Sequence, residues 1–112
     1  MVDDHAAFRS SARRLLELAG YDVVGEAGDG SSALALVREL EPELVLLDIA
    51  LPDMSGFDVA EALAGGRSAI VLVSSRAAAD LGKRATRSGA RGFIPKDHLS
   101  EEALRELVEE SR

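Results

Sequence analysis

The chain has 112 residues, enough for one domain with a hydrophobic core but too few for two lobes around a cleft. It contains no cysteine, which excludes disulfides, thiolate metal sites and cysteine nucleophiles. With a formal net charge of −7 and scattered basic residues, we expect a cation or a basic protein face as partner, rather than nucleic acid or a membrane. No apolar run approaches the roughly 20 residues that span a bilayer, so we expect a cytoplasmic protein.

Helical spacing of apolar residues alternates with short continuous apolar runs along the chain. Gly20 follows the first helical segment as a C-cap would, and Pro42 prevents the second from continuing past Glu41. Ser100 is placed to cap the last helix. In chain order, the predicted elements are a helix over 6–19, a strand over 21–27, a helix over 31–40, a strand over 44–48, a helix over 57–64, a strand over 69–73, a weaker helix over 77–88, a strand over 91–95 and a helix from 101 onward.

Polar side chains stand where the predicted strands end. Asp48 ends the run 44–48, which has the pattern of a strand covered by helices on both faces. Ser74 and Lys96 follow two later strands, and the pair Asp3-Asp4 stands near the start of the chain. Because parallel strands bring their carboxyl ends to one edge of a sheet, we expect these groups to converge there. Carboxylates, a hydroxyl and an ammonium together predict metal-assisted phosphoryl chemistry.

These motifs and their spacing resemble the receiver domains of two-component response regulators over essentially the whole chain. The resemblance is carried by Val2-Asp3-Asp4, Asp48 with Leu51-Pro52 and Gly56, Ser74, Gly89-Ala90 and Lys96. It implies one receiver domain over residues 1–112, with a flavodoxin-like, doubly wound, parallel five-stranded sheet of order 2-1-3-4-5. It also implies that the protein is no enzyme beyond catalysing its own phosphorylation and dephosphorylation.

The resemblance implies that a sensor histidine kinase or a phosphotransfer protein delivers a phosphoryl group to Asp48. Mg²⁺ is expected at Asp4, Asp48 and the backbone carbonyl of Ala50, with Asp3 holding a metal-bound water. Ser74 and Lys96 are expected to contact phosphoryl oxygens. An aromatic switch is implied at Phe93, remodelling the surface of residues 77–110 for a downstream protein partner or for a homodimer formed through the final helices.

Each candidate residue also has a purely structural explanation when taken alone. Asp48 could cap a turn, Asp3-Asp4 could be a solvated chain end, and Lys96 could lie on the surface. Phe93 could be an ordinary core residue. His5 and His98 lack helical ligand spacing, so we expect solvation or local hydrogen bonding rather than metal ligation.

The chain departs from the resemblance at its beginning, where only Met1-Val2 precede the acidic pair. The first strand is therefore expected to be largely missing, leaving backbone groups of its two neighbours unpaired in the middle of the sheet and lowering stability. We expect the true start to lie upstream of Met1. The pair Lys96-Asp97 resembles regulators whose receiver is fused to a helix-turn-helix output.

Two other functions compete with phosphoryl acceptance. The first is a phosphorylation-dead scaffold that retains the receiver fold. The second is a dinucleotide-binding unit, because residues 28–33 fit the glycine fingerprint and Asp48 follows at about the right distance to bind a ribose. The nucleotide hypothesis leaves Asp3-Asp4, Ser74 and Lys96 unexplained.

Overall fold

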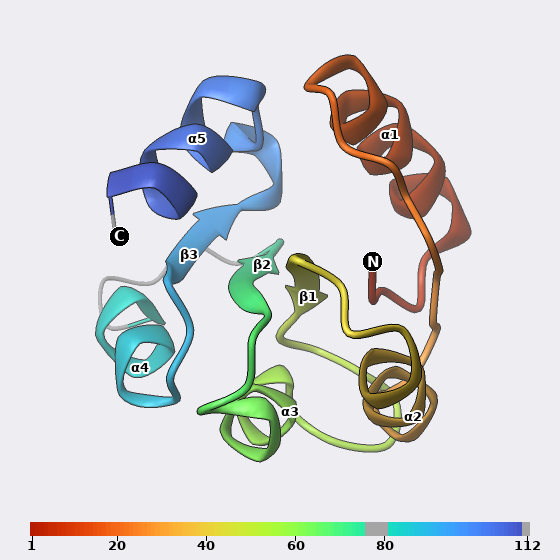
Figure 1. Ribbon diagram of the computed structural model, residues 1–112, viewed down its shortest axis with the longest axis vertical. Helices are drawn as coiled ribbons and strands as arrows, with labels where there is room; N and C mark the ends of the chain where they lie inside the picture. Colours follow the sequence, from red (N-terminus) through yellow and green to blue (C-terminus); the bar gives the residue numbers. More distant parts are fainter. Residues whose placement is uncertain (76–80, 111–112) are drawn as a thin grey trace.

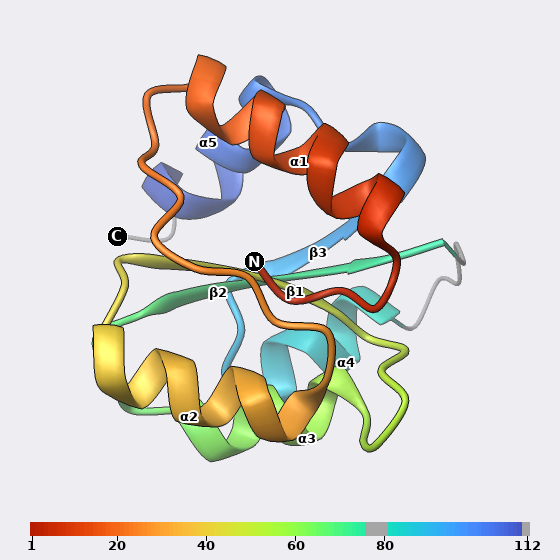
Figure 2. The ribbon, with the colours of Figure 1, turned by 90° about the vertical axis from the view of Figure 1, so that its right-hand side faces the viewer.

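The computed structural model describes residues 1–75 and 81–110, which form a parallel sheet between two layers of helices (Figures 1 and 2). The strands are β1 (Leu44–Asp48), β2 (Ala69–Ser74) and β3 (Gly92–Pro95), in the order β1-β2-β3. Figure 2 shows α1 (Ala6–Leu18) and α5 (Glu101–Glu110) on one face of this sheet, and α2 (Gly30–Leu40), α3 (Gly56–Leu63) and α4 (Leu81–Arg87) on the other. A 3-10 turn, η1 (Lys96–His98), follows β3.

The hydrophobic core has two clusters, one on each face of the sheet, because side chains alternate between the faces along β1 and β2. Successive residues of a strand point to opposite faces of its sheet, and both faces are covered here by helices. Val45, Leu47, Ile70 and Leu72 belong to the hydrophobic cluster beneath α2, α3 and α4. Leu46, Val71 and Val73 belong to the cluster beneath α1 and α5. The prediction that 44–48 is a strand covered on both faces is therefore confirmed.

Local signals for the helix ends are also confirmed. Gly20 has a φ of 93°, the left-handed conformation that favours glycine after a helix. The Ser100 hydroxyl accepts a hydrogen bond from the N–H of Ala103 at 3.0 Å, as an N-cap does. Helix α4 (Leu81–Arg87) agrees with the helix predicted over 77–88, of which residues 77–80 lie outside the described part of the chain.

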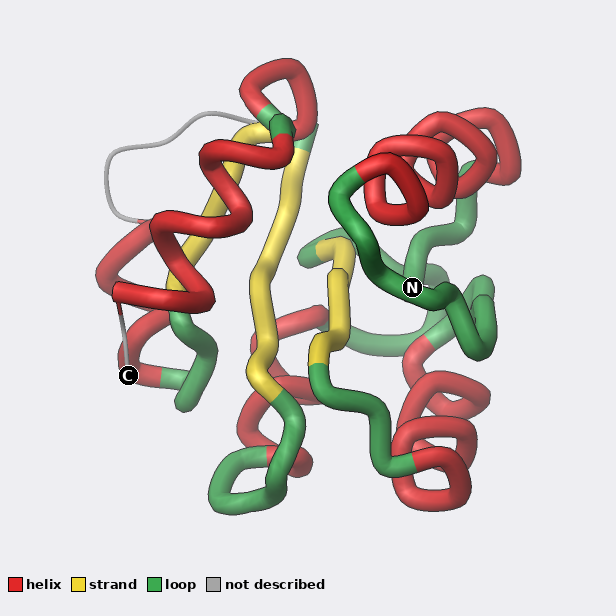
Figure 3. Tube along the Cα trace, turned by 45° about the horizontal axis from the view of Figure 1, so that its top comes forward, coloured by secondary structure: helices red, strands yellow, loops and turns green. Residues whose placement is uncertain are grey.

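The strand predicted over 21–27 is wrong, because these residues form a loop with a single bridge at Ala27 (Figure 3). Val2 forms parallel bridges to Ala27 on one side and to Leu47 of β1 on the other. A strand needs a hydrogen-bonded neighbour along its length. Within residues 1–75 and 81–110, only Met1 and Asp3 form ladder hydrogen bonds with this loop, at Gly25 and Ala27. The described residues thus contain three strands, and the five-stranded order 2-1-3-4-5 remains a prediction.

A groove of about 500 Å³ lies between the loop 21–25 and the first half of β1. Its lining includes Leu16, Leu36, Val37 and Leu44. The carbonyl of Leu46 and the N–H of Asp48 both bond to Val2, so the alternation of the strand turns the Leu44 carbonyl and the Leu46 N–H toward the groove. The groove therefore lies where the incomplete first strand was expected to leave backbone groups of the sheet without a neighbouring strand.

Candidate functional site

Asp48, Lys96 and Asp3 meet at the carboxyl edge of the sheet. Asp48 is the last residue of β1, and Lys96 opens η1 directly after β3. The Lys96 ammonium lies 2.6 Å from Asp3 Oδ2 and 3.2 Å from Asp48 Oδ2. The side chain of Asp3 is fully buried, and that of Asp48 is 4% exposed. One cation thus holds two buried carboxylates together, as the strand-end argument predicted.

The register of the sheet places Ser74 beside this group. Asp48 pairs with Val73, and Ser74 pairs with Pro95, the residue before Lys96. Ser74 is buried, at 5% exposure. Phe93 pairs with Leu72 and packs, partly buried, against the cluster beneath α2, α3 and α4. The predicted hydroxyl is therefore at the site edge, whereas Phe93 lies two residues farther down the sheet.

Burial and charge set the pKa values of the three ionisable groups apart. Burial raises the pKa of Asp48, and the neighbouring charge of Asp3 raises it further. Burial acts in the same direction on Asp3, but hydrogen bonds from Lys96 and from the N–H of His5 outweigh it and lower its pKa. Burial opposes the charge of Lys96, but the two carboxylates outweigh this effect and raise its pKa. The lysine therefore stays charged and stabilises the ionised form of Asp3, its nearer partner, more than that of Asp48.

The same edge offers oxygen ligands for a divalent cation. Asp3, Asp4, His5 and Asp48 can each present a ligand atom within 4.8 Å of the others. Asp3 Oδ2 is buried, and the Lys96 ammonium faces it at 2.6 Å. Three carboxylates suit a hard cation such as Mg²⁺, so this donor set fits the expected ion. His5 is largely exposed, and its Nδ1 lies 2.9 Å from Asp4 Oδ1, which agrees with the local contact expected for this residue.

The loop after β1 is packed closely against the nucleophile candidate. The N–H of Ala50 donates to Asp48 Oδ1 at 3.2 Å, and the N–H of Gly56 donates to the carbonyl of Ile49 at 2.7 Å. A Cβ at Gly56 would lie 2.3 Å from the Asp48 carbonyl oxygen. A glycine is therefore required for α3 to begin this close to the end of β1.

Asp53, from the same loop, caps the N-terminus of α2. Its carboxylate accepts hydrogen bonds from the N–H groups of Gly30 at 2.7 Å and Ser31 at 2.9 Å. Asp29 accepts a third from the N–H of Ser32 at 2.7 Å. A pyrophosphate bound by the glycine fingerprint would need these backbone donors, which two carboxylates already occupy. This arrangement does not favour the dinucleotide hypothesis.

Replacing Asp53 by asparagine is expected to lower the melting temperature by a few degrees at pH 7. The N–H groups of Gly30 and Ser31 lower the pKa of Asp53, so its stabilising effect is present above the pKa of an unfolded aspartate, about 3.9, and is lost as the pH falls through the lower folded value. Thermal melts from pH 7 down to pH 3 measure this. A difference between the two proteins that stays constant over this range would contradict the assignment.

Sequence reasoning missed two contributors to this region. Asp53 lies between the strand predicted over 44–48 and the helix predicted over 57–64 and was given no role, because a cap from 23 residues beyond the helix start has no local signal. Phe8 belongs to the helix predicted over 6–19 and was given no part in the site, yet its ring centroid lies 4.3 Å from the Lys96 ammonium. Contacts of this kind depend on how the chain is folded, so spacing along the sequence does not reveal them.

The domain thus combines a parallel α/β fold with an acidic, lysine-containing site at the ends of its strands. The sequence model of the family described as response regulator receiver domain matches residues 1–109. The chain belongs to this family and has its flavodoxin-like fold, with five α-helices around a parallel sheet in the part of the chain that the structure describes. No helix within residues 1–75 and 81–110 has both the length and the apolar character needed to cross a membrane.

Similar proteins agree with this assignment. The chain is 36% identical over 97 residues to the transcriptional regulatory protein PdtaR of Mycobacterium tuberculosis, covering 86% of this chain and 47% of the relative. It is 36% identical over 110 residues to the "Probable transcriptional regulatory protein NarL" of the same organism, covering 96% and 51%. The solved receiver domain of that NarL superimposes with a TM-score of 0.87 at 34% identity, covering 98% of this chain and 91% of the other. The chain spans about half the length of these curated relatives.

Proposed function

We propose that this domain accepts a phosphoryl group on Asp48 from a sensor histidine kinase or a phosphotransfer protein, and that the modification switches a protein-binding surface. The observation that carries the proposal is the buried pair of carboxylates, Asp48 and Asp3, held by one lysine at the carboxyl edge of the sheet. A purely structural ion pair does not need a second buried carboxylate beside the first, because like charges repel.

In the proposed reaction, a carboxylate oxygen of Asp48 attacks the phosphorus of a phosphohistidine. The phosphorus–nitrogen bond breaks, its electron pair stays on the histidine nitrogen, and an acyl phosphate forms on Asp48. Lys96 and Ser74 contact the phosphoryl oxygens, on which negative charge is spread during the transfer. Hydrolysis of the acyl phosphate by water, also at this site, returns Asp48 to its free form.

Mg²⁺ is the cofactor in this proposal, with Asp4, Asp48 and the carbonyl of Ala50 as ligands and Asp3 holding a metal-bound water. When bound, the ion neutralises charge that would otherwise keep two anionic reactants apart. Asp4 is well placed to bind it, because its carboxylate is partly exposed while those of Asp3 and Asp48 are buried. The N–H of Ala50 already bonds to Asp48, which keeps this residue at the site.

The output of the switch is proposed to be a change of surface around α4, β3 and α5. Ser74 and Phe93 lie on neighbouring strands, so a movement of the hydroxyl toward a phosphoryl group leaves room for the ring to turn inward. A downstream protein, or a second copy of the domain, would bind the altered surface. The curated relatives are named as transcriptional regulators and are about twice as long as this chain. Residues 1–112 would therefore receive the signal, in the cytoplasm, and other parts of such proteins would control transcription.

Incubation with Mg²⁺ and acetyl phosphate, followed by intact mass measurement, tests the proposal. We expect one phosphoryl adduct on the wild-type protein and at least a hundredfold less on Asp48→Asn or without metal, because the nucleophile or its charge neutralisation is then missing. Circular dichroism of each sample shows that it is folded. A folded wild-type protein without an adduct would contradict the proposal and support a phosphorylation-dead scaffold.

A further inference from the structure

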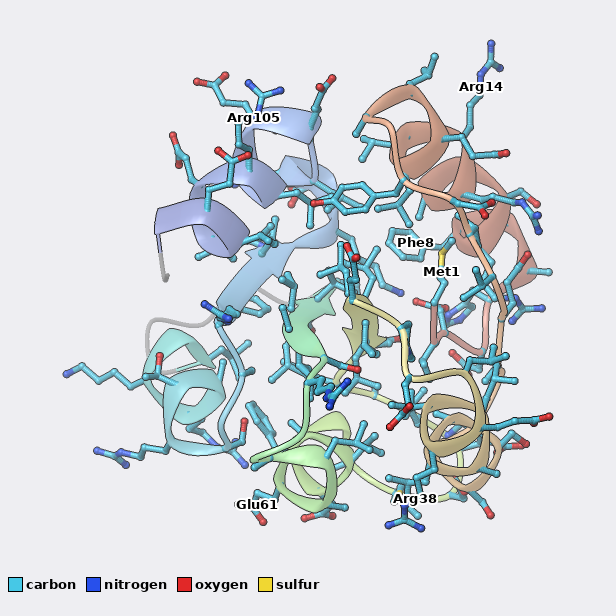
Figure 4. The ribbon with its side chains drawn as sticks, viewed as in Figure 1. Met1, Phe8, Arg14, Arg38, Glu61 and Arg105 are labelled. Atoms are coloured by element: carbon cyan, nitrogen blue, oxygen red, sulfur yellow. The ribbon has the colours of Figure 1, made fainter. Side chains whose placement is uncertain are left out.

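Phe8 joins helix α1 to the lysine of the candidate site. It stands in the first turn of α1, and its side chain points from the helix toward the sheet, beside Met1 (Figure 4). The Lys96 ammonium lies over its ring, 4.3 Å from the centroid. A cation within about 6 Å of an aromatic ring face is attracted by the electron density of that face. The apolar stripe of α1 alone requires a hydrophobic residue at this position, but it does not require an aromatic one.

The ring adds a third neighbour to the Lys96 ammonium. Asp3 and Asp48 contact the ammonium through one carboxylate oxygen each, at 2.6 and 3.2 Å. Lys96 is only 15% exposed, so most of its length is covered by protein. A flexible four-carbon stem does not by itself fix the position of its charge. The ring face and the two carboxylates together restrict the ammonium to a small volume next to Asp48.

Arg9, which follows Phe8 in α1, contacts the main chain of the same site. Arg9 donates a hydrogen bond from Nη1 to the carbonyl of Asp3, and its Nε lies 3.2 Å from Glu26 Oε1. Consecutive residues of the first turn of α1 therefore contact both the cation and the main chain of one of its acidic partners. The position of α1 on the sheet is thus coupled to the geometry of the site.

We propose that Phe8 is a positioning residue for phosphoryl transfer, whose ring holds the Lys96 ammonium beside Asp48 where it meets an incoming phosphoryl oxygen. This inference rests on the proposed function of Asp48. Without the ring face, the ammonium is held only by the two carboxylates, and pairing with them competes with its contact to the phosphoryl group. Phe8 touches neither the phosphodonor nor the nucleophile in this role and acts through Lys96.

The test compares rates of adduct formation from acetyl phosphate and Mg²⁺ in Phe8→Leu, Phe8→Tyr and wild-type protein. Leucine keeps an apolar side chain but has no ring, and we expect it to slow the reaction about fivefold, the equivalent of roughly 1 kcal/mol for a cation–π contact. Tyrosine keeps the ring face and is expected to react within about twofold of wild type. Leu18→Ala removes an exposed side chain from the same helix and serves as the matched control, with an unchanged rate.

Melting temperatures separate positioning from loss of fold. A Phe8→Leu protein that is folded and as fast as wild type, or a Phe8→Tyr protein as slow as Phe8→Leu, would overturn the inference. A second readout does not depend on phosphorylation: the ε-methylene protons of Lys96 should show an upfield ring-current shift in NMR spectra that Phe8→Leu abolishes and Phe8→Tyr retains. Absence of the ring-current shift in the wild-type protein also overturns the inference. If the shift is present but the protein forms no adduct, the contact between Phe8 and Lys96 exists and the proposed function of Asp48 has failed.

Discussion

Gly56→Ala is expected to lower the free energy of unfolding by about 3 kcal/mol and to slow phosphorylation of Asp48 at least tenfold. An added Cβ would lie 2.3 Å from the Asp48 carbonyl oxygen and 2.8 Å from Ile49 Cα, both of them backbone atoms. Backbone atoms cannot rotate away as the end of a flexible side chain can, so α3 or the end of β1 has to move. A movement of β1 displaces Asp48 relative to Lys96 and to the metal ligands.

Gly82→Ala is the matched control, because the same methyl group is added to a helical glycine with no described atom within 4 Å of the new Cβ. Alanine is the better helix former by up to about 1 kcal/mol, so this variant should be as stable as wild type or slightly more stable. Urea unfolding gives both free energies, and intact mass gives the rates. Equal stability of Gly56→Ala and wild type would show that the close approach of α3 to β1 is not required by the fold.

Lys96→Met is expected to destabilise the metal-free protein by about 3 kcal/mol at pH 7, because it leaves two buried carboxylates without a counter-charge. Methionine keeps much of the length of the lysine stem and removes only the charged end. Without the ammonium, the carboxylates repel each other more strongly, and the pKa of Asp48, already raised by burial and by Asp3, rises further. The loss of stability in Lys96→Met should become smaller as the pH is lowered. The pKa of Asp48 is higher in the folded state than in the unfolded chain, so folding is accompanied by proton uptake, and protonation of Asp48 removes the repulsion between the two carboxylates.

Two additions make this result specific to the site. Asp48→Asn in the Lys96→Met background should recover much of the lost stability, since one of the two charges is then absent. Mg²⁺ should raise the melting temperature of Lys96→Met more than that of wild type, because the ion no longer competes with the ammonium for Asp3 and Asp48.

Lys83→Met, on the exposed face of α4, is the matched control, because it changes the net charge equally without touching either carboxylate. A loss of stability in Lys83→Met as large as in Lys96→Met would point to net charge instead of the buried pair.

The element types, apart from residues 21–27, followed from local features of the sequence. Apolar spacing, Gly20 and Ser100 predicted helices close to their observed bounds, because these signals act within one or two turns of chain. Residues 21–27 have strand-like composition but form a loop. Composition describes a preference, whereas a strand exists only where a neighbour supplies hydrogen bonds. Among the described residues, Met1 and Asp3 supply them at Gly25 and Ala27, at one end of this segment.

By itself, the sequence determined which residue types stand at the strand ends, because these follow directly from where the apolar runs stop. Asp48, Ser74 and Lys96 were all predicted this way, and the parallel sheet brings them to one edge since all its strands end there. Only the tertiary structure decided which groups touch. The lysine lies nearer to Asp3 than to Asp48, Asp53 caps a helix begun 23 residues earlier, and Phe8 faces Lys96 across the sheet edge. Such contacts join segments far apart in the chain, and their distances depend on the packing of the whole domain.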